Sequence, residues 1–324
     1  MRNEMIIKEL SYMVRTYDGL NKLIVSTKNR LTSFFPVVLE EGQEDKSSKE
    51  LREIQYKNDS TLNGYISGKR QADGLEQVKG RLERSIGKHL VYWDIWNQWL
   101  TNVPGIGHYY GGKLILLYYY KFESVCPKCG DLVVKKEHTF FCETCQKSIK
   151  GEGNLVFKIT ERDFPRISSW NHFLGMHNTA HHKACRKRLT DDNYCPVCKV
   201  NVPEEDIIYL KPMRQAGVQS DWSSAGRTLA YLIAESFVKA SGNGGRSYRD
   251  YYDSRRELRD KTHPDFSKGH KYNMAKNETV KLFLSHFWQV ARTIDGKPLT
   301  EPYIVAKDPV HNKIEPFYWE GLNQ

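Results

Sequence analysis

Apolar residues recur every three or four positions in the N-terminal part of the chain, and this spacing predicts an amphipathic helix. The stripe has a heptad-like order: Ile6, Leu10, Met13, Tyr17, Leu20, Ile24 and Leu31. A second stripe begins near Asp73: Leu75, Val78, Leu82, Ile86, Leu90 and Trp93. Residues 1–95 are therefore expected to form a helical hairpin. The first stripe also resembles a coiled-coil seam, which leaves two interpretations open: a homodimer, or packing within its own chain.

The predicted hairpin contains a polar linker at residues 37–60, where "EEGQEDKSSKE" lacks any bulky apolar residue. After the second helix, Pro104 and Gly105 must end the helical pattern. Gly107 then begins an apolar helix that leads to Tyr120, with a strand possible at its end. The turn "NVPGIG" between two helices is typical of a helix-hairpin-helix.

The C-terminal part of the chain is predicted to be mostly helical. Residues 201–294 contain three helical patterns: "AGRTLAYLIAESFVKASG", "YRDYYDSRRELRDK" and "KYNMAKNETVKLFLSHFWQVAR". Several prolines follow Asp295, so residues 295–324 are expected to form an extended tail.

The chain has 324 residues, a net charge of +10 and a pI near 9.1, which favour a polyanionic partner. The charge gathers in two places: Lys183, Arg186, Lys187 and Arg188, then Arg246, Arg249, Arg255, Arg256, Arg259 and Lys261. No segment is apolar enough to span a bilayer, and the N-terminus lacks the apolar core of a secretory signal. We therefore expect a cytoplasmic protein without a membrane partner, associated with the nucleoid when it is bound to DNA.

The seven cysteines indicate metal binding rather than a disulfide framework, because six of them form three CxxC pairs. "CPKCGDLVVKKEHTFFCETC" provides four thiolates: Cys126, Cys129, Cys142 and Cys145. Two tight turns joined by a short β-hairpin suit a closed tetrahedral Zn²⁺ site, with no position left for a catalytic water. The sequence thus predicts a structural zinc ion in a small ribbon.

A second zinc site is predicted from the cysteines that remain, which are Cys185, Cys195 and Cys198. Three thiolates need a fourth ligand, and three histidines lie nearby. If this segment is helical, His181 and Cys185 share one face at i and i+4, and His182 lies three residues before Cys185. His181 is the preferred ligand and His182 the second choice, whereas His177 reaches the site less directly. Two structural zinc ions would then use every cysteine.

Two other segments have features of nucleic-acid binding. In the "NVPGIG" turn, Gly105, Ile106 and Gly107 present backbone N–H groups to a phosphate, and Lys113 in the following helix could assist them. In "YRDYYDSRRELRDK", three arginines alternate with tyrosines and suit phosphate contacts and base stacking: Arg249, Arg255 and Arg256. The acidic residues of the same segment support another interpretation, a solvated helix held by ion pairs four residues apart.

Six segments occur in an order that resembles a known family: "KNRL", "LTNVPGIG", "WNHFLGMH", "SSAGRTLAYLIAESFVKASG", "YRDYYDSRRELR" and "AKNETVKLFLSHFWQVAR". They look like the C-terminal part of the RNA-guided insertion-sequence transposases, which join an N-terminal RuvC-like nuclease domain to a serine-bearing transposase domain. The resemblance implies a coiled coil, a helix-hairpin-helix domain (here residues 96–124) and a helical transposase-like domain (201–294). Residues 125–200, with their cysteines, are an insertion relative to that family.

The chain departs from the family in two respects. Residues 1–95 offer no β-rich acidic nuclease domain, and no prediction is made for Mg²⁺. The region that matches the family's nucleophilic serine contains Ser220, Ser223 and Ser224, without the family's spacing and without an identifiable base. Ser220 is the candidate nucleophile, although these serines also suit the N-cap of a helix that begins near Ala225.

The sequence thus predicts a mostly α protein: a helical hairpin or coiled coil, a helix-hairpin-helix core and a small β zinc-ribbon insertion. Its predicted function is DNA binding, with a possible guide RNA, as a transposase-like protein without strand cleavage of its own. One alternative is an active serine transposase subunit that takes its nuclease from a second chain. Another is an RNA-binding or assembly protein that uses its zinc knuckles as the contact surface.

Overall fold

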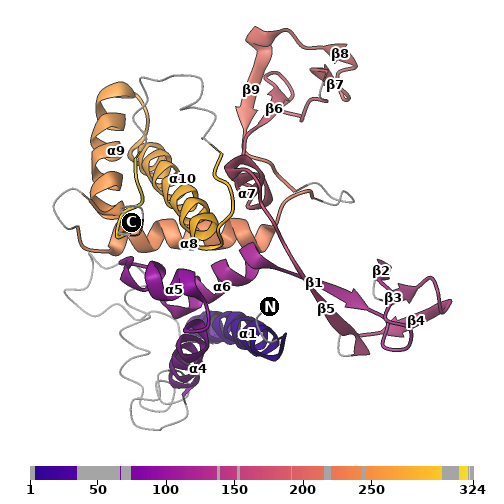
Figure 1. Ribbon diagram of the computed structural model, residues 1–324. Helices are drawn as coiled ribbons and strands as arrows, with labels where there is room; N and C mark the ends of the chain where they lie inside the picture. Colours follow the sequence, from indigo (N-terminus) through magenta and orange to yellow (C-terminus); the bar gives the residue numbers. More distant parts are fainter. Residues whose placement is uncertain are drawn as a thin grey trace. The chain divides into compact units, whose positions relative to one another are not determined.

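The computed structural model describes residues 4–34, 66, 74–136, 139–151, 154–190, 192–214, 220–242, 246–300, 314–319 and 321. The predicted linker at residues 37–60 and most of the predicted tail lie outside this part of the chain. The chain divides into two compact units. Unit 1 comprises Met1–Trp96 and Gly107–Leu116, and unit 2 comprises Asn97–Ile106 and Leu117–Gln324. Figure 1 shows that the described elements are mostly helices, with several small sheets, which confirms the predicted mostly α class.

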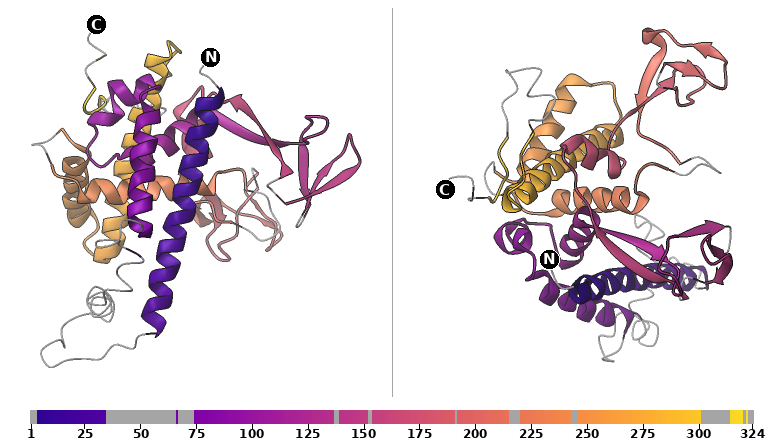
Figure 2. Two further views of the ribbon diagram at one scale, coloured as in Figure 1. Left: turned by 90° about the horizontal axis from the view of Figure 1, so that it is seen from below. Right: turned by 45° about the vertical axis from the view of Figure 1, so that its right-hand side comes forward.

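Unit 1 is built on two antiparallel helices, α1 (Glu4–Phe34) and α4 (Leu75–Leu90), which lie side by side in Figure 2. Ion pairs at the two ends fix the direction. His89 near the end of α4 contacts Glu9 near the start of α1, and Lys28 near the end of α1 contacts Glu76 in the first turn of α4. The hairpin prediction is therefore confirmed.

The apolar stripe of α1 is covered within the chain. Its buried members in the described part are Leu10, Met13, Tyr17 and Ile24. They pack against α4 and against α6 (His108–Tyr119), whose glycines permit a close approach. A Cβ on Gly111 would lie 2.5 Å from the Trp96 ring, so a side chain at this position would displace the indole. Homodimerisation through this stripe stays a prediction, and the stripe already has partners in its own chain.

Unit 2 has an aromatic core formed by α7 (Ile167–Phe173), α8 (Ser224–Lys239), α9 (Tyr248–Thr262) and α10 (Lys268–Ile294). Phe237, Phe283 and Phe287 are fully buried in it. Trp99, which lies between α5 (Asp94–Gln98) and the 3₁₀ turn Leu100–Asn102, stacks on Phe283 and donates a hydrogen bond to the Phe317 carbonyl at 2.7 Å. In this way, residues far apart in the sequence share one core.

Short antiparallel strands flank the cysteine-rich segments. β1 (Tyr120–Val125) pairs with β5 (Val156–Glu161), and the sheet β2 (Val133–Lys136), β3 (Thr139–Cys142) and β4 (Lys147–Lys150) lies between them in sequence. Further along the chain, β6 (Thr179–His182) pairs with β9 (Ile207–Leu210), and β7 (Tyr194–Cys195) pairs with β8 (Val200–Asn201). The predicted strand after α6 and the predicted hairpin between the cysteine pairs are both present. None of the described helices combines the length and apolar character that a membrane crossing requires.

Serine hydroxyls cap the three long helices of unit 2. Ser223 accepts a hydrogen bond from the Gly226 N–H, Ser247 from Asp250 and Ser267 from His270. Each cap satisfies one of the backbone donors that a helix start leaves without a partner in the helix. Ser223 thus has the capping role predicted for the serines before Ala225.

Replacement of Ser223 by alanine is expected to destabilise unit 2 by about 1 kcal/mol, because α8 loses its N-cap hydrogen bond. Ser220→Ala is the matched control, since Ser220 lies outside α8 and caps none of its N–H groups. Urea unfolding followed by tryptophan fluorescence measures both variants. Equal midpoints for the two variants would contradict the capping role.

Candidate metal centres

Four cysteine thiols meet in the first cluster, formed by Cys126, Cys129, Cys142 and Cys145. The Sγ atoms of Cys126 and Cys145 lie 3.9 Å apart, and those of Cys129 and Cys142 lie 3.4 Å apart. Disulfide sulfurs would lie about 2.05 Å apart. Four sulfurs at about 2.3 Å from a central ion would lie about 3.8 Å from one another, because that is the edge of such a tetrahedron. The thiols are therefore spaced for a tetrahedral metal ion.

The second cluster contains His182, Cys185, Cys195 and Cys198, whose ligand atoms all lie within 4.8 Å of one another. The Cys185 Sγ lies 3.4 Å from His182 Nδ1 and 3.5 Å from the Cys195 Sγ. The first distance matches the edge of about 3.6 Å expected between a nitrogen and a sulfur on one tetrahedral ion. We call residues 126–150 the first metal module and residues 179–210 the second metal module.

The choice of His181 as fourth ligand was wrong, because the segment is a strand and not a helix. His181 and His182 are neighbours in β6, so their side chains point to opposite faces. His181 is buried on the other face, where its Nδ1 lies 2.9 Å from the Thr179 carbonyl oxygen. The third histidine, His177, stacks on His172 with ring centroids 4.0 Å apart and is not part of the cluster.

All four ligand pairs have the same local construction. In each pair, two residues separate the ligands, and the residue after the second ligand has a left-handed backbone: Gly130 (φ 77°), Gln146 (φ 50°), Arg186 (φ 57°) and Lys199 (φ 58°). In three of the turns, the N–H of that residue donates to the carbonyl of the first ligand at 2.7 to 2.8 Å. The sequence did contain this signal: His182 and Cys185 repeat the spacing of the CxxC pairs, which identifies His182 as the first ligand of a fourth knuckle.

Backbone hydrogen bonds favour the thiolate form of the first cysteine in two knuckles. N–H groups of the following turn lower the pKa of Cys126 to about 7 and the pKa of Cys195 to about 6. Hydrogen bonds with Cys185 and Cys195 raise the pKa of Cys198 to about 11, because they hold its proton between neighbouring thiols. Since a metal ion must displace such protons, binding releases them, and metal affinity falls as the pH falls.

Both clusters fit the same chemical role. Four protein ligands complete a tetrahedral shell, so no coordination position remains for a substrate or an activated water. A metal ion would join two β-turns that have almost no apolar core between them. In the second metal module, the cluster of buried apolar residues consists of Leu189, Cys195 and Val202. A metal ion bound at either cluster would therefore act as a structural cross-link.

The predicted phosphate-binding residues of the "NVPGIG" turn are mostly occupied within the protein. The Gly105 carbonyl accepts a hydrogen bond from Ser236 Oγ at 2.6 Å, and Ile106 is buried. A Cβ on Gly107 would lie 3.3 Å from a carboxylate oxygen of Glu83, which places a negative charge where an anion would have to approach. Lys113 pairs with Asp18 at 2.7 Å.

The three predicted arginines of α9 form ion pairs. Arg249 contacts Asp253 and Arg256 contacts Asp260, each four residues further on, and Arg255 contacts Glu278 on α10. This arrangement matches the alternative interpretation of a helix held by ion pairs. These arginines are already paired with carboxylates of the same unit, so their charge is less available to a polyanion.

The four predicted cations of the second metal module are exposed: Lys183, Arg186, Lys187 and Arg188. Arg188 lies 4.0 Å from Asp221, and no described carboxylate forms an ion pair with the other three. The candidate nucleophile Ser220 donates its hydroxyl to the Trp222 carbonyl oxygen at 3.2 Å, and no described side chain is placed to take its proton.

Comparison of the chain with protein-family models, curated proteins and solved structures found no match. The case for a function therefore rests on the residues of this chain.

Metal analysis of the purified protein is expected to give two ions per chain, and His182→Ala is expected to retain one. The alanine removes one of four ligands from the second cluster and leaves the first intact. His182→Cys should bind two ions, because it supplies a thiolate at the same place. His181→Ala is the matched control and should also bind two, as measured by inductively coupled plasma mass spectrometry. The assignment would be contradicted if His181→Ala lost one ion and His182→Ala kept both.

Proposed function

We propose that the protein binds DNA through the second metal module, and that the ion in both modules is zinc. The observation that supports this proposal best is a set of exposed cations without carboxylate partners, located in the turn that holds a metal ligand. A metal ion would stiffen this turn. Long cationic side chains on a stiff turn lose less conformational entropy when they bind a partner.

Zinc is favoured by the donor sets. Thiolate and imidazole ligands in closed tetrahedral groups of four are the usual environment of structural Zn²⁺, whereas Mg²⁺ and Ca²⁺ prefer oxygen. Zn²⁺ has no redox chemistry, and its d electrons impose no geometry other than the tetrahedron that the ligands offer. Two such sites therefore suit structural cross-links. In this proposal, each module is a zinc-ribbon-like knuckle pair.

The contact surface is centred on Arg186 and Lys187. The Lys183 N–H donates to the Asp206 carbonyl at 2.8 Å, which brings the acidic turn Glu204–Asp206 beside Lys183. Arg188 lies near Asp221. Arg186 and Lys187 lie between these two cations in the sequence and form no ion pair with a described carboxylate, so they are the cations most available to a phosphate backbone.

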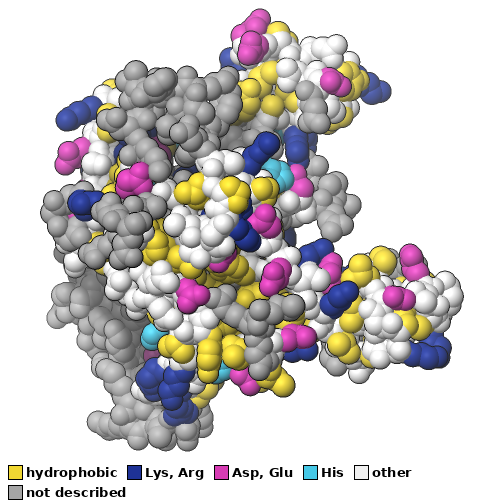
Figure 3. Space-filling model, in the orientation of Figure 1, with side chains coloured by type: hydrophobic (Ala, Val, Ile, Leu, Met, Phe, Trp, Pro, Cys, Tyr) yellow, Lys and Arg dark blue, Asp and Glu magenta, His cyan; other side chains and the backbone are white. Residues whose placement is uncertain are grey.

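Net charge alone does not locate this surface. On the face shown in Figure 3, Lys and Arg side chains are interspersed with acidic ones. Contacts from a few cations to phosphates would hold DNA without reading its sequence. This agrees with a transposase-like role in which the protein grips DNA, a role that the order of sequence segments suggests.

The proposal does not include strand cleavage by this chain. A serine nucleophile needs a base to accept its proton, and Ser220 instead donates to a main-chain carbonyl. The chain is thus proposed as a DNA-binding component, whose cutting partner, if the reaction has one, is another chain.

The double variant Arg186→Gln, Lys187→Gln is expected to weaken binding to duplex DNA. Loss of two phosphate contacts should reduce the slope of log affinity against log salt by roughly 1.8, since each contact contributes about 0.9. Fluorescence anisotropy with a labelled duplex, over a series of KCl concentrations, measures both quantities.

The matched control is Lys147→Gln, Lys150→Gln, which removes two exposed cations from β4 of the first metal module. The control should keep the salt slope of the native protein. Equal losses of DNA affinity in the two double variants would mean that binding depends on net charge and not on the position of the cations. Stronger competition by structured RNA than by duplex DNA would favour the RNA-binding alternative.

A strand-cleavage and strand-transfer assay of the metal-loaded protein is expected to show the same background for the native chain and for Ser220→Ala, because Ser220 has no base. Activity of the native chain that disappears in the variant would show that this serine is a nucleophile.

A further inference from the structure

Unit 2 contains a cavity of about 380 Å³ that is lined by cations from three separate elements. Lys211 follows β9, Arg227 comes from α8 and Lys276 comes from α10. Two amide side chains of α10, Asn273 and Asn277, complete the polar wall. The volume lies within the range typical of small-ligand sites, about 300–1,000 Å³.

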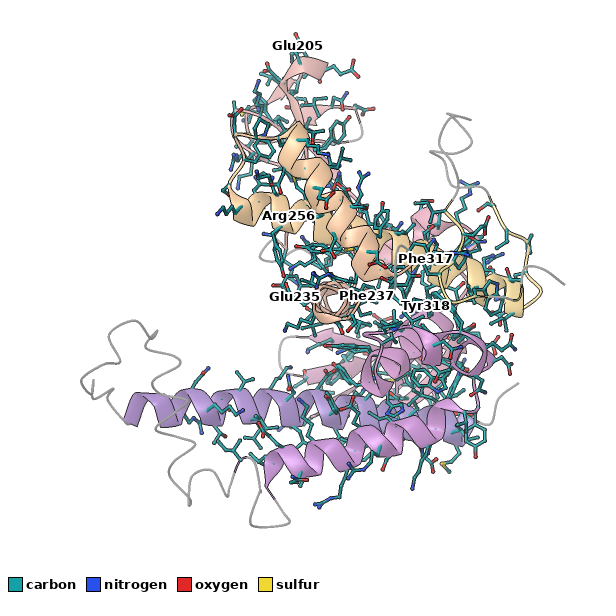
Figure 4. The ribbon with its side chains drawn as sticks, turned by 90° about the vertical axis from the view of Figure 1, so that its left-hand side faces the viewer. Glu205, Glu235, Phe237, Arg256, Phe317 and Tyr318 are labelled. Carbon is teal, nitrogen blue, oxygen red and sulfur yellow. The ribbon has the colours of Figure 1, made fainter. Side chains whose placement is uncertain are left out.

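The charges around this cavity do not balance. Lys276 forms an ion pair with Glu235, which is labelled in Figure 4 and belongs to α8. Lys211 and Arg227 form no ion pair with any described carboxylate. The Lys211 ammonium donates to the Asn277 side-chain oxygen, and one Arg227 N–H donates to the Pro212 carbonyl. Both partners are neutral, so two positive charges stay uncompensated.

Lys211 shows the electrostatic consequence of this arrangement. Burial lowers its pKa to about 8, and the nearby positive charges of Lys281, Arg227 and Lys276 lower it in the same direction. Burial also lowers the pKa of Arg227 and that of Lys281. Several like charges that are desolvated together destabilise the folded protein unless an anion binds among them.

A neighbouring hollow continues the same chemistry. It has a volume of about 400 Å³, shares Arg227 and Tyr231 with the cavity and adds Arg214. Arg227 therefore lines both hollows, to which Arg214 and Lys211 each add one further cation. Guanidinium and ammonium groups together with side-chain amides are the donors that bind tetrahedral oxyanions in proteins.

We propose that this cavity is a binding site for a phosphate group, held by Lys211 and Arg227 and by the amide nitrogens of Asn273 and Asn277. The phosphate can belong to a free phosphate ester or to a nucleic-acid backbone, since both present the same tetrahedral anion. The site is distinct from the exposed cations of the second metal module, and it stands whether or not that module binds DNA.

Thermal unfolding of the full-length, metal-loaded protein tests the proposal with sulfate as the probe, because sulfate is tetrahedral and keeps its charge over the working pH range. Sulfate also stabilises proteins generally by exclusion from their surfaces. For this reason, the measured quantity is the difference in melting-temperature rise between native protein and variant at equal sulfate concentration and ionic strength.

Lys211→Met is expected to change two quantities in opposite directions. Without sulfate it should melt at a higher temperature than the native chain, because it removes a desolvated charge that three other cations repel. Its affinity for sulfate should fall about tenfold or more, since a hydrogen bond to a charged group is lost. Lys211→Arg should retain binding, and Lys158→Met, which removes an exposed lysine of β5, should behave as the native protein.

The pH dependence gives a readout that needs no variant. The pKa of Lys211 in the folded chain is below its ordinary value of 10.5, so the sulfate-free protein should become more stable as the pH rises from about 8 to 10.5. Sulfate affinity should fall over the same interval, because the Lys211 ammonium loses its proton. Lysine side-chain NMR should show that sulfate raises this pKa. The other titratable or charged groups around Lys211 and the cavity are Lys281, Lys276, Arg227, Glu235, Tyr231 and His270.

Two results would overturn the proposal. One is an equal sulfate response in the native protein and Lys211→Met. The other is a Lys211 pKa that sulfate does not move. If sulfate binds, a second comparison identifies the source of the phosphate: competition by a short DNA duplex indicates a backbone phosphate, and competition by pyrophosphate alone indicates a small phosphate ester.

Discussion

The cross-link that a tetrahedral metal ion would form at each ligand cluster is the constraint on which the cysteine-rich part of the described structure depends. Its strands are two to six residues long, and sheets of two or three such strands are marginal in water without a covering core. The second metal module has three buried apolar residues, one of which, Cys195, is itself a ligand. A tetrahedral ion would replace the missing core by joining both ends of the module at one point, so that its binding energy would become folding energy.

This constraint explains why the basic turn is where it is. Arg186 follows the ligand Cys185 directly and has a left-handed backbone, because the knuckle must reverse there. Its side chain thus starts from a backbone that a bound metal ion would fix. A left-handed non-glycine residue costs about 1–2 kcal/mol, and the hydrogen bond from the Arg186 N–H to the His182 carbonyl at 2.7 Å stabilises that conformation. Order at Arg186 and Lys187 would then follow from coordination of the metal.

Much of the fold could be predicted from the sequence because it depends on local patterns. The stripe through Leu10 and Ile24 gave the first helix, and the CxxC spacing gave the ligands. The helical spacing of His181 and Cys185 predicts the wrong fourth ligand, because the segment is a strand and the cluster contains His182, which repeats the two-residue spacing of the CxxC pairs. The ion pairs of Lys113 with Asp18 and of Arg255 with Glu278 lay beyond sequence patterns, since the partners are far apart in the chain.

The same limit applies with more force to the cationic cavity. Lys211, Arg227 and Lys276 lie in three different segments, and none of them belongs to a basic run in the sequence. The two basic runs of the sequence have other environments. The arginines of α9 form ion pairs with carboxylates, and the cations beside Cys185 are exposed to solvent. A cation in water costs the fold almost nothing, whereas a desolvated one without a counter-charge destabilises it. Net charge therefore indicates that a polyanion is attracted, while burial and pairing decide where an anion is bound, and by that criterion Lys211 carries more information than any exposed arginine of the chain.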